Sequence, residues 1–171
     1  MVNNSLNVNE LCWELIEYYN TQEYNEAQLL LEKGFPYLKK AAEDGNAKAQ
    51  YFLGQCYVRG CGTDKNLKQA IYWIKKSAKQ GLAIAQSHLA NLIVYGHTGS
   101  IDDKKTIYNL YKKAAKQGDA HGQEGLAKCY YNGNHVKADH KKALFWYKKA
   151  AEQGLSRSQT MVEILNEDGI T

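Results

Sequence analysis

The sequence predicts an all-α protein, a right-handed α/α superhelical solenoid built from two-helix repeats of about 36 residues. The heptapeptides KKAAEDG, KKSAKQG, KKAAKQG and KKAAEQG end at glycines that lie 36 or 37 residues apart, Gly45, Gly81, Gly118 and Gly154. A fixed period between about 20 and 50 residues is characteristic of stacked repeat arrays. The chain also has a single proline in 171 residues, which favours helices because proline interrupts them.

The period arranges the chain as one elongated domain, residues 1–171, in which each repeat contacts mainly its neighbours. We expect an N-terminal helical cap or divergent repeat, three repeats and a C-terminal capping helix, at 1–45, 46–81, 82–118, 119–154 and 155–171. Within the cap, helices are expected near 9–20 and at 24–44. The second of these should break near Gly34 and Pro36, because proline removes a backbone donor.

Each repeat begins with a helix in which apolar or small residues recur every four positions, matching the helical period of 3.6 residues. These first helices are expected at 46–60, 82–96, 119–133 and 155–169. Each of them ends at a glycine, which fits a left-handed C-cap. A small residue follows the buried leucine, where it would let a neighbouring helix approach closely; these residues are Gly54, Ala90 and Ala127.

A second helix follows in each repeat, expected at 67–81, 105–118 and 141–154. Trp73, Leu110 and Trp146 occupy one equivalent position, and a Ser-Ala or Ala-Ala pair comes four residues later. Large and small side chains would then alternate along the buried stripe, as interdigitated helices require. The aromatic residues are expected on this stripe.

These residues resemble the Sel-one-like repeat, a relative of the tetratricopeptide repeat. The first copy carries the pattern in Ala49, Leu53, Gly54, Tyr57, Gly60, Ala70, Trp73, Lys76, Ala78 and Gly81. The resemblance covers three copies, 46–154, and the second departs most. There, residues 97–100 replace a short G-x-G turn, and Ile107 and Leu110 replace alanine and tryptophan. The resemblance implies that first helices line the concave side and second helices the convex side.

The first helices also carry the candidate binding residues. Positions outside the buried stripe differ from repeat to repeat, so the scaffold is constant while the surface varies. Their mixture of tyrosine, charged and amide side chains is typical of interface anchors. We expect a protein partner to contact Lys48, Tyr51, Gln55, Arg59, Ser87, Asn91, Tyr95, His121, Glu124, Lys128, Tyr131 and Asn132.

Charge is segregated along the chain. Residues 1–45 carry net −5, residues 46–154 net +11 and residues 155–171 net −2. This distribution would steer an acidic partner to the central repeats; the alternative is that the lysines are simply solvated. Without a leader pattern or an apolar run long enough to span a bilayer, we expect a cytoplasmic protein that makes no membrane contact. We also expect the chain to be monomeric on its own.

The residues indicate no catalytic chemistry. We expect the four cysteines, Cys12, Cys56, Cys61 and Cys129, to be reduced thiols, because no disulfide framework emerges from their spacing. The histidines lack zinc-ligand spacing, although His135, Asp139 and His140 share a loop. We find no phosphate-binding glycine loop and no nucleophile beside a base. No enzyme, cofactor or metal site is therefore predicted.

We interpret the chain as a protein–protein interaction module that binds its partner along the concave surface. By analogy of size, it resembles bacterial adaptor or immunity proteins that sequester a toxin or effector. One alternative is a small-ligand binder or weak hydrolase resembling cysteine-rich secreted relatives, against which the missing cysteine pairs argue. Another is a nucleic-acid binder using the lysine pairs of the second helices. Aromatic residues on the buried stripe argue against it, because such sites need exposed rings.

Overall fold

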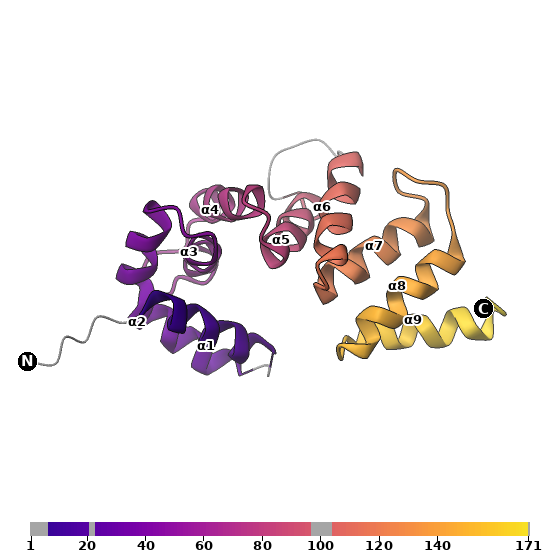
Figure 1. The fold of residues 1–171 in the computed structure, drawn as a ribbon, viewed down its shortest axis with the longest axis horizontal. Helices are drawn as coiled ribbons and strands as arrows, with labels where there is room; N and C mark the ends of the chain where they lie inside the picture. The colour runs from indigo at the N-terminus through magenta and orange to yellow at the C-terminus, as the bar shows by residue number, and fades with distance from the viewer. Residues whose placement is uncertain (1–6, 21–22, 97–103, 171) are drawn as a thin grey trace, which may run out of the picture. The chain divides into compact units, whose positions relative to one another are not determined.

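The computed structural model describes residues 7–20, 23–96 and 104–170 (Figure 1). These residues form nine α-helices and no strand, which confirms the all-α fold class. The helices are α1 (Val8–Asn20), α2 (Tyr24–Glu43), α3 (Ala47–Arg59), α4 (Leu67–Lys79), α5 (Ala83–Val94), α6 (Lys104–Lys116), α7 (Ala120–Asn132), α8 (His140–Glu152) and α9 (Ser156–Glu167). The predicted departure at 97–100 lies outside the described residues.

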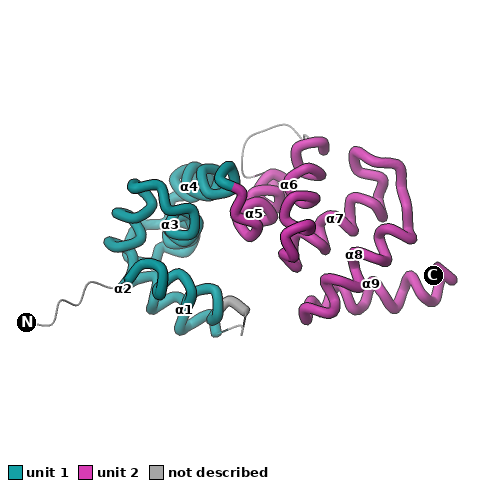
Figure 2. Tube along the Cα trace, viewed as in Figure 1, with its two compact units in different colours: residues 1–80 teal, residues 81–171 magenta. Residues whose placement is uncertain are grey.

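The chain divides into two compact units, residues 1–80 and 81–171 (Figure 2). Unit 1 contains α1 to α4 and unit 2 contains α5 to α9. Inside each unit every helix packs against the next one along the chain. The first helices of successive repeats also touch, α1 against α3 in unit 1 and α5 against α7 in unit 2. This second set of contacts places first-helix side chains from two repeats on a shared surface.

Local sequence signals set the helix ends. Asn46 and Asp119 accept a hydrogen bond from the backbone N–H three residues later, at 3.0 and 2.6 Å, which is the usual N-cap arrangement. Gly60 and Gly133 end α3 and α7 in the left-handed conformation, with φ of 80° and 70°. The prediction of glycine C-caps is therefore confirmed at both positions.

The prediction that the helix at 24–44 breaks near Gly34 and Pro36 is wrong, because α2 is continuous and contains Pro36. Gly34 is buried, and a Cβ there would lie 2.7 Å from Leu11 of α1. Its glycine therefore permits close helix packing and does not end the helix. The buried stripe that runs through Leu31, Gly34 and Leu38 supplies packing that outweighs the hydrogen bond lost at proline.

Small residues within the first helices allow the second helices to approach, as predicted for Gly54 and, in addition, at Gly122. A Cβ at Gly54 of α3 would lie 2.6 Å from the Ile74 side chain of α4. One at Gly122 of α7 would lie 2.5 Å from the Cβ of Ala114 on α6. Real Cβ atoms do not come so close, so α3 pairs with α4 and α6 with α7 at a distance that requires glycine.

The buried stripe of the second helices lies one residue later than predicted in two repeats. Trp146 and Leu110 are only partly buried, whereas Tyr147 and Tyr111 are covered. In α4 both Trp73 and Ile74 are buried. The expectation that the aromatic residues lie on the buried stripe is wrong for two positions, since Tyr72 is 49% exposed and Phe145 is 52% exposed.

Recurring glutamines tie each first helix to the end of the second helix of its repeat, and sequence reasoning missed them. Gln80 Nε2 donates to Gln50 Oε1 at 2.8 Å, and Gln153 Nε2 donates to Gln123 Oε1 at 2.8 Å. The same pair recurs between Gln117 and Gln86 at 3.0 Å. Buried amides require such partners, and their recurrence at a 36- or 37-residue interval was the available signal.

Candidate protein-binding surface

The candidate surface is formed by side chains of neighbouring first helices within each unit. Because α5 and α7 touch, residues of two repeats lie on one face of unit 2. The predicted residues fall into three groups. Tyr95, His121 and Asn132 are exposed; Lys48, Arg59, Asn91, Lys128 and Tyr131 are half-buried; Tyr51, Gln55, Ser87 and Glu124 are buried.

The four buried residues differ from the expectation of surface positions. Tyr51 accepts a hydrogen bond from Gln55 Nε2 at 2.6 Å, and the Ser87 hydroxyl donates to the Ile84 carbonyl at 3.2 Å. Each first helix is covered over a wider arc than a stripe at steps of four predicts, because it packs against helices of two repeats. These side chains shape and support the surface and expose little area to a partner.

Glu124 lies at the centre of a polar cluster in unit 2. It forms an ion pair with Lys128, one turn later on α7. Burial, followed by neighbouring groups that include Glu124, raises the pKa of the Tyr111 and Tyr147 hydroxyls. The carboxylate therefore lies near buried rings from both α6 and α8, and its ion pair holds the half-buried Lys128 beside it on α7.

Two further candidate residues are held by neighbours on second helices. The Tyr111 hydroxyl donates to Asn91 Oδ1 at 2.6 Å, and the Tyr131 ring stacks on His140 with centroids 5.1 Å apart. Tyr95, by contrast, is 68% exposed just beyond the end of α5. A large amphipathic ring with this exposure beside pre-positioned polar groups is typical of an interface anchor.

Sequence reasoning missed Trp13, which lies on the corresponding surface of unit 1. Its ring is 62% exposed, and Lys48 Nζ from α3 lies 3.8 Å from the ring centroid, a cation–π contact. The spacing of the neighbouring residues could have predicted its exposure, because Leu11, Cys12 and Leu15 form the buried side of α1. A helix with those buried positions must turn Trp13 outward.

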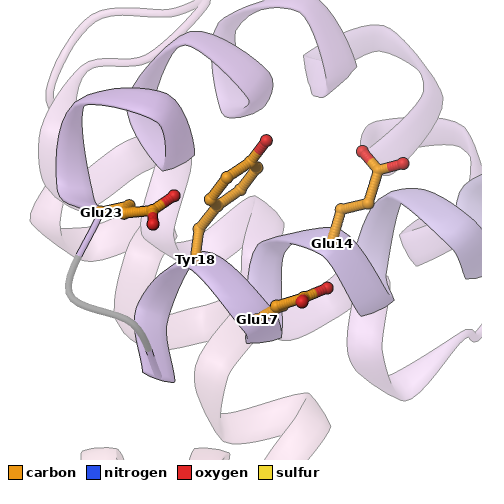
Figure 3. A pocket seen from close by; sticks show the side chains of 4 residues that line it. All are labelled: Glu14, Glu17, Tyr18 and Glu23. Carbon is orange, nitrogen blue, oxygen red and sulfur yellow. The ribbon is translucent and has the colours of Figure 1, made fainter.

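A pocket of about 200 Å³ lies beside α1 (Figure 3). Glu14, Glu17 and Tyr18 line it from α1, and Glu23 lines it from the position before α2. None of the predicted binding residues lines this pocket. Its three carboxylates would repel an anionic ligand.

The structure places the cysteines and loop histidines away from any metal-binding arrangement. No group of three or more potential metal ligands occurs among the described residues. Burial raises the pKa of Cys12 and Cys129 to about 11 and that of Cys56 to about 12. Because only the thiolate is a good nucleophile or metal ligand, these thiols are poorly reactive in the folded protein.

We predict that all four cysteines are free thiols in the native protein, as they are in the structure. Titration with a thiol reagent after denaturation without reductant should find four reactive groups. The same titration of folded protein near pH 7.5 should be slow, because burial suppresses both thiolate formation and access. Recovery of only two thiols would indicate a disulfide and would contradict the prediction.

The fold and this surface define an α-helical repeat protein of the solenoid class. More particularly, the chain belongs to the Sel1 repeat family: the Sel1 repeat model matches residues 31–46, 47–82, 83–119 and 120–155. Sel1 repeat proteins are generally protein–protein interaction modules and are not generally enzymes. Among the described residues, no helix is both long enough and apolar enough to cross a membrane.

Solved structures share the fold. A Sel1 repeat protein from Oxalobacter formigenes is 32% identical, with a TM-score of 0.66 over 74% of this chain and 94% of that one. A protective antigen of uropathogenic Escherichia coli with an SLR fold is 35% identical, with a TM-score of 0.71 over 85% of this chain and 33% of that one. Helicobacter pylori cysteine rich protein B has a TM-score of 0.56 at 20% identity, covering 77% of this chain and 93% of that one, which shows the fold alone.

Curated relatives match over shorter segments. A sel1-like repeat-containing protein of Acanthamoeba polyphaga mimivirus is 56% identical over 43 residues, 25% of this chain and 7% of that protein. DAP3-binding cell death enhancer 1 of Rattus norvegicus is 36% identical over 67 residues, 39% of this chain and 13% of that protein. The chain therefore corresponds to a small part of these much longer relatives.

Proposed function

We propose that this chain binds a protein partner through the first-helix surface, most specifically as a bacterial adaptor or immunity protein that sequesters a toxin or effector. The observation that carries the proposal is the exposed Tyr95 ring, which lies one turn after Asn91 on α5. The α7 helix, which touches α5, adds Lys128 and Tyr131, each held by a neighbouring side chain. Membership of a family of interaction modules supports it, as does a relative whose name records binding to another protein.

The electrostatics and the cysteines support two narrower parts of the proposal. The net charge of +11 over residues 46–154 would accelerate encounter with an acidic partner. Four buried free thiols agree with action in the reducing cytoplasm. The adaptor or immunity assignment rests on the size of the module and on analogy. Its test is whether the captured partner is a toxin whose activity the purified chain inhibits.

Alanine at Tyr95 or Tyr131 is expected to weaken partner binding by about 2 kcal/mol or more, roughly 30-fold in Kd, if either ring is a buried anchor. Calorimetric titration of a partner identified by affinity capture and mass spectrometry would measure the effect. Tyr72→Ala is the matched control, because this ring is 49% exposed on the second helix α4. Circular dichroism should show that all three variants keep the fold.

Charge reversal of Lys112 and Lys113 on α6 is expected to change mainly the association rate and its salt dependence. These lysines lie on a second helix, away from the proposed contact, so they act on the encounter and not on the bound state. If this reversal abolished binding while Tyr95→Ala and Tyr131→Ala had no effect, recognition would lie on the second helices. The proposed surface would then be wrong.

A further inference from the structure

Two helices of this chain each expose an aromatic ring among charged side chains. The charges are negative on α1 and positive on α8. On α1, Trp13 is 62% exposed and the exposed residues around it are Asn9 and the acidic Glu10, Glu14 and Glu17. On α8, Phe145 is 52% exposed and the surrounding exposed residues are the basic Lys141, Lys142, Lys148 and Lys149. We call these sets the acidic stripe and the basic stripe.

The two stripes match in spacing as well as in charge. Residues three and four apart are neighbours on one helix face, so each ring has charges about one turn before and one turn after it. Glu10 and Glu17 are seven residues apart, which is about 10 Å along a helix, and so are Lys141 and Lys148. Lysines flank Phe145 on both sides along α8. If Trp13 stacks on Phe145, the carboxylates of α1 therefore face lysines whether the two helices are parallel or antiparallel.

Contacts inside the chain leave both rings accessible. Lys149 Nζ lies 5.1 Å from the centroid of Phe145, and Lys48 Nζ lies 3.8 Å from that of Trp13, yet each ring stays more than half exposed. Tryptophan is enriched among the residues that carry the binding energy of interfaces, so an accessible Trp13 suits a contact. Asp139 pairs with Lys142 at 2.9 Å, whereas Lys141, Lys148 and Lys149 lie on the same face and repel one another. A negatively charged partner would relieve that repulsion.

We propose that the acidic stripe on α1 of one copy of this chain docks on the basic stripe on α8 of a second copy. The two stripes are different surfaces of the same chain, so the contact is head-to-tail and leaves one stripe open at each end of the pair. The area of two helix faces is small, so the association is weak and of the transient class. It differs from the sequence-based expectation that the chain is monomeric on its own.

This association uses other residues than the proposed partner-binding surface of unit 2. The α8 helix is a stronger acceptor than α4. Tyr72 of α4 has lysines at 68, 75 and 76, but Gln69 takes the place of the fourth. The α6 helix has Asn109 at the equivalent position, and no ring there is exposed. The α6 lysines therefore offer a control with the same charge and no aromatic contact.

The test is sedimentation of the full chain between about 10 µM and about 1 mM, in about 0.02 M and about 0.5 M salt. We expect the average mass to rise with concentration at low salt, at least doubling, and to return to that of a monomer at high salt. The variants K148E/K149E and E10K/E14K should each stay monomeric. An equimolar mixture of the two should associate again, because each contact between unlike variants pairs opposite charges.

Several controls keep the test decisive. K112E/K113E changes the net charge equally but should not prevent association, and Phe145→Ser should reduce it while circular dichroism stays unchanged. A monomer at every concentration, an equal effect of K112E/K113E, or no recovery on mixing would overturn the proposal. So would binding of a single-stranded oligonucleotide by monomeric protein that K148E/K149E abolishes, which would assign the basic stripe to nucleic acid. Tyr95→Ala should leave self-association unchanged, which separates this contact from partner binding.

Discussion

Replacing Tyr147 by alanine is expected to lower the free energy of unfolding by about 3–5 kcal/mol. The Tyr147 ring is 2% exposed and belongs to the core cluster of Ala127 from α7, Leu144 from α8 and Leu165 from α9. Three helices pack around one side chain, so they cannot close the space that its removal leaves. Urea denaturation followed by circular dichroism would measure the loss.

Phe145→Ala is the matched control, because this ring lies two residues earlier on the same helix and is 52% exposed. Its cost should be near 0.5 kcal/mol, as for other surface substitutions. Trp146→Ala should fall between the two, since Trp146 is only partly buried against the clusters on either side of it. Equal effects at Phe145 and Tyr147 would show that the face of α8 that packs on the core is assigned wrongly.

Raising the pH from about 9 to about 12 is expected to lower the free energy of unfolding by several kcal/mol. Burial raises the pKa of Cys12 and Cys129 to about 11 and that of Cys56 to about 12, against 9.0 for an ordinary thiol. The unfolded chain therefore loses these protons first. The stabilisation is fully present below about pH 9 and is lost as the pH rises through the folded values, at about 1.4 kcal/mol for each pKa unit of a group.

The buried Tyr111 and Tyr147 hydroxyls act in the same direction, because burial raises the pKa of both. Urea denaturation at pH 8, 10 and 11 would measure the slope of stability against pH. Cys129→Ala should make that slope shallower by removing one titrating group, although the variant also loses some packing at every pH. A stability that stayed constant from pH 8 to pH 11 would contradict the burial of these groups.

Local patterns in the sequence were enough to predict the helices and most of their ends, with the exception of the break expected inside α2. The 36-residue period, the glycines that cap α3 and α7, and the small residue after each buried leucine are short-range features, and the structure agrees with them. The recurring Gln50–Gln80 and Gln123–Gln153 pairs were visible as repeats in the same way. The recurrence of a polar residue in the sequence does not indicate which other residue it hydrogen-bonds to.

The candidate surface was harder to predict, because burial depends on neighbours that lie far away in sequence. Tyr51, Gln55, Ser87 and Glu124 looked like surface positions by periodicity, yet helices of two repeats cover them. Trp13 lies in the N-terminal cap, outside the three full repeats, so no equivalent position in another repeat indicates its role. Tyr95 and Tyr131 stay accessible, and they are the residues on which the proposed function now rests.

The sequence by itself determined that the chain is a helical repeat protein of this family, because period, capping and small-residue spacing are written in consecutive residues. Only the tertiary structure decided which side of each helix is covered. One residue turns a helix by about 100°, so a slight rotation against its neighbours buries Tyr147 and leaves Trp146 partly exposed. Close approach likewise requires glycine at 122, because a Cβ there would lie 2.5 Å from the Cβ of Ala114 on α6. The equivalent positions hold Ala49 and Ala85, so this requirement comes from the packing of α6 on α7 and not from the repeat pattern.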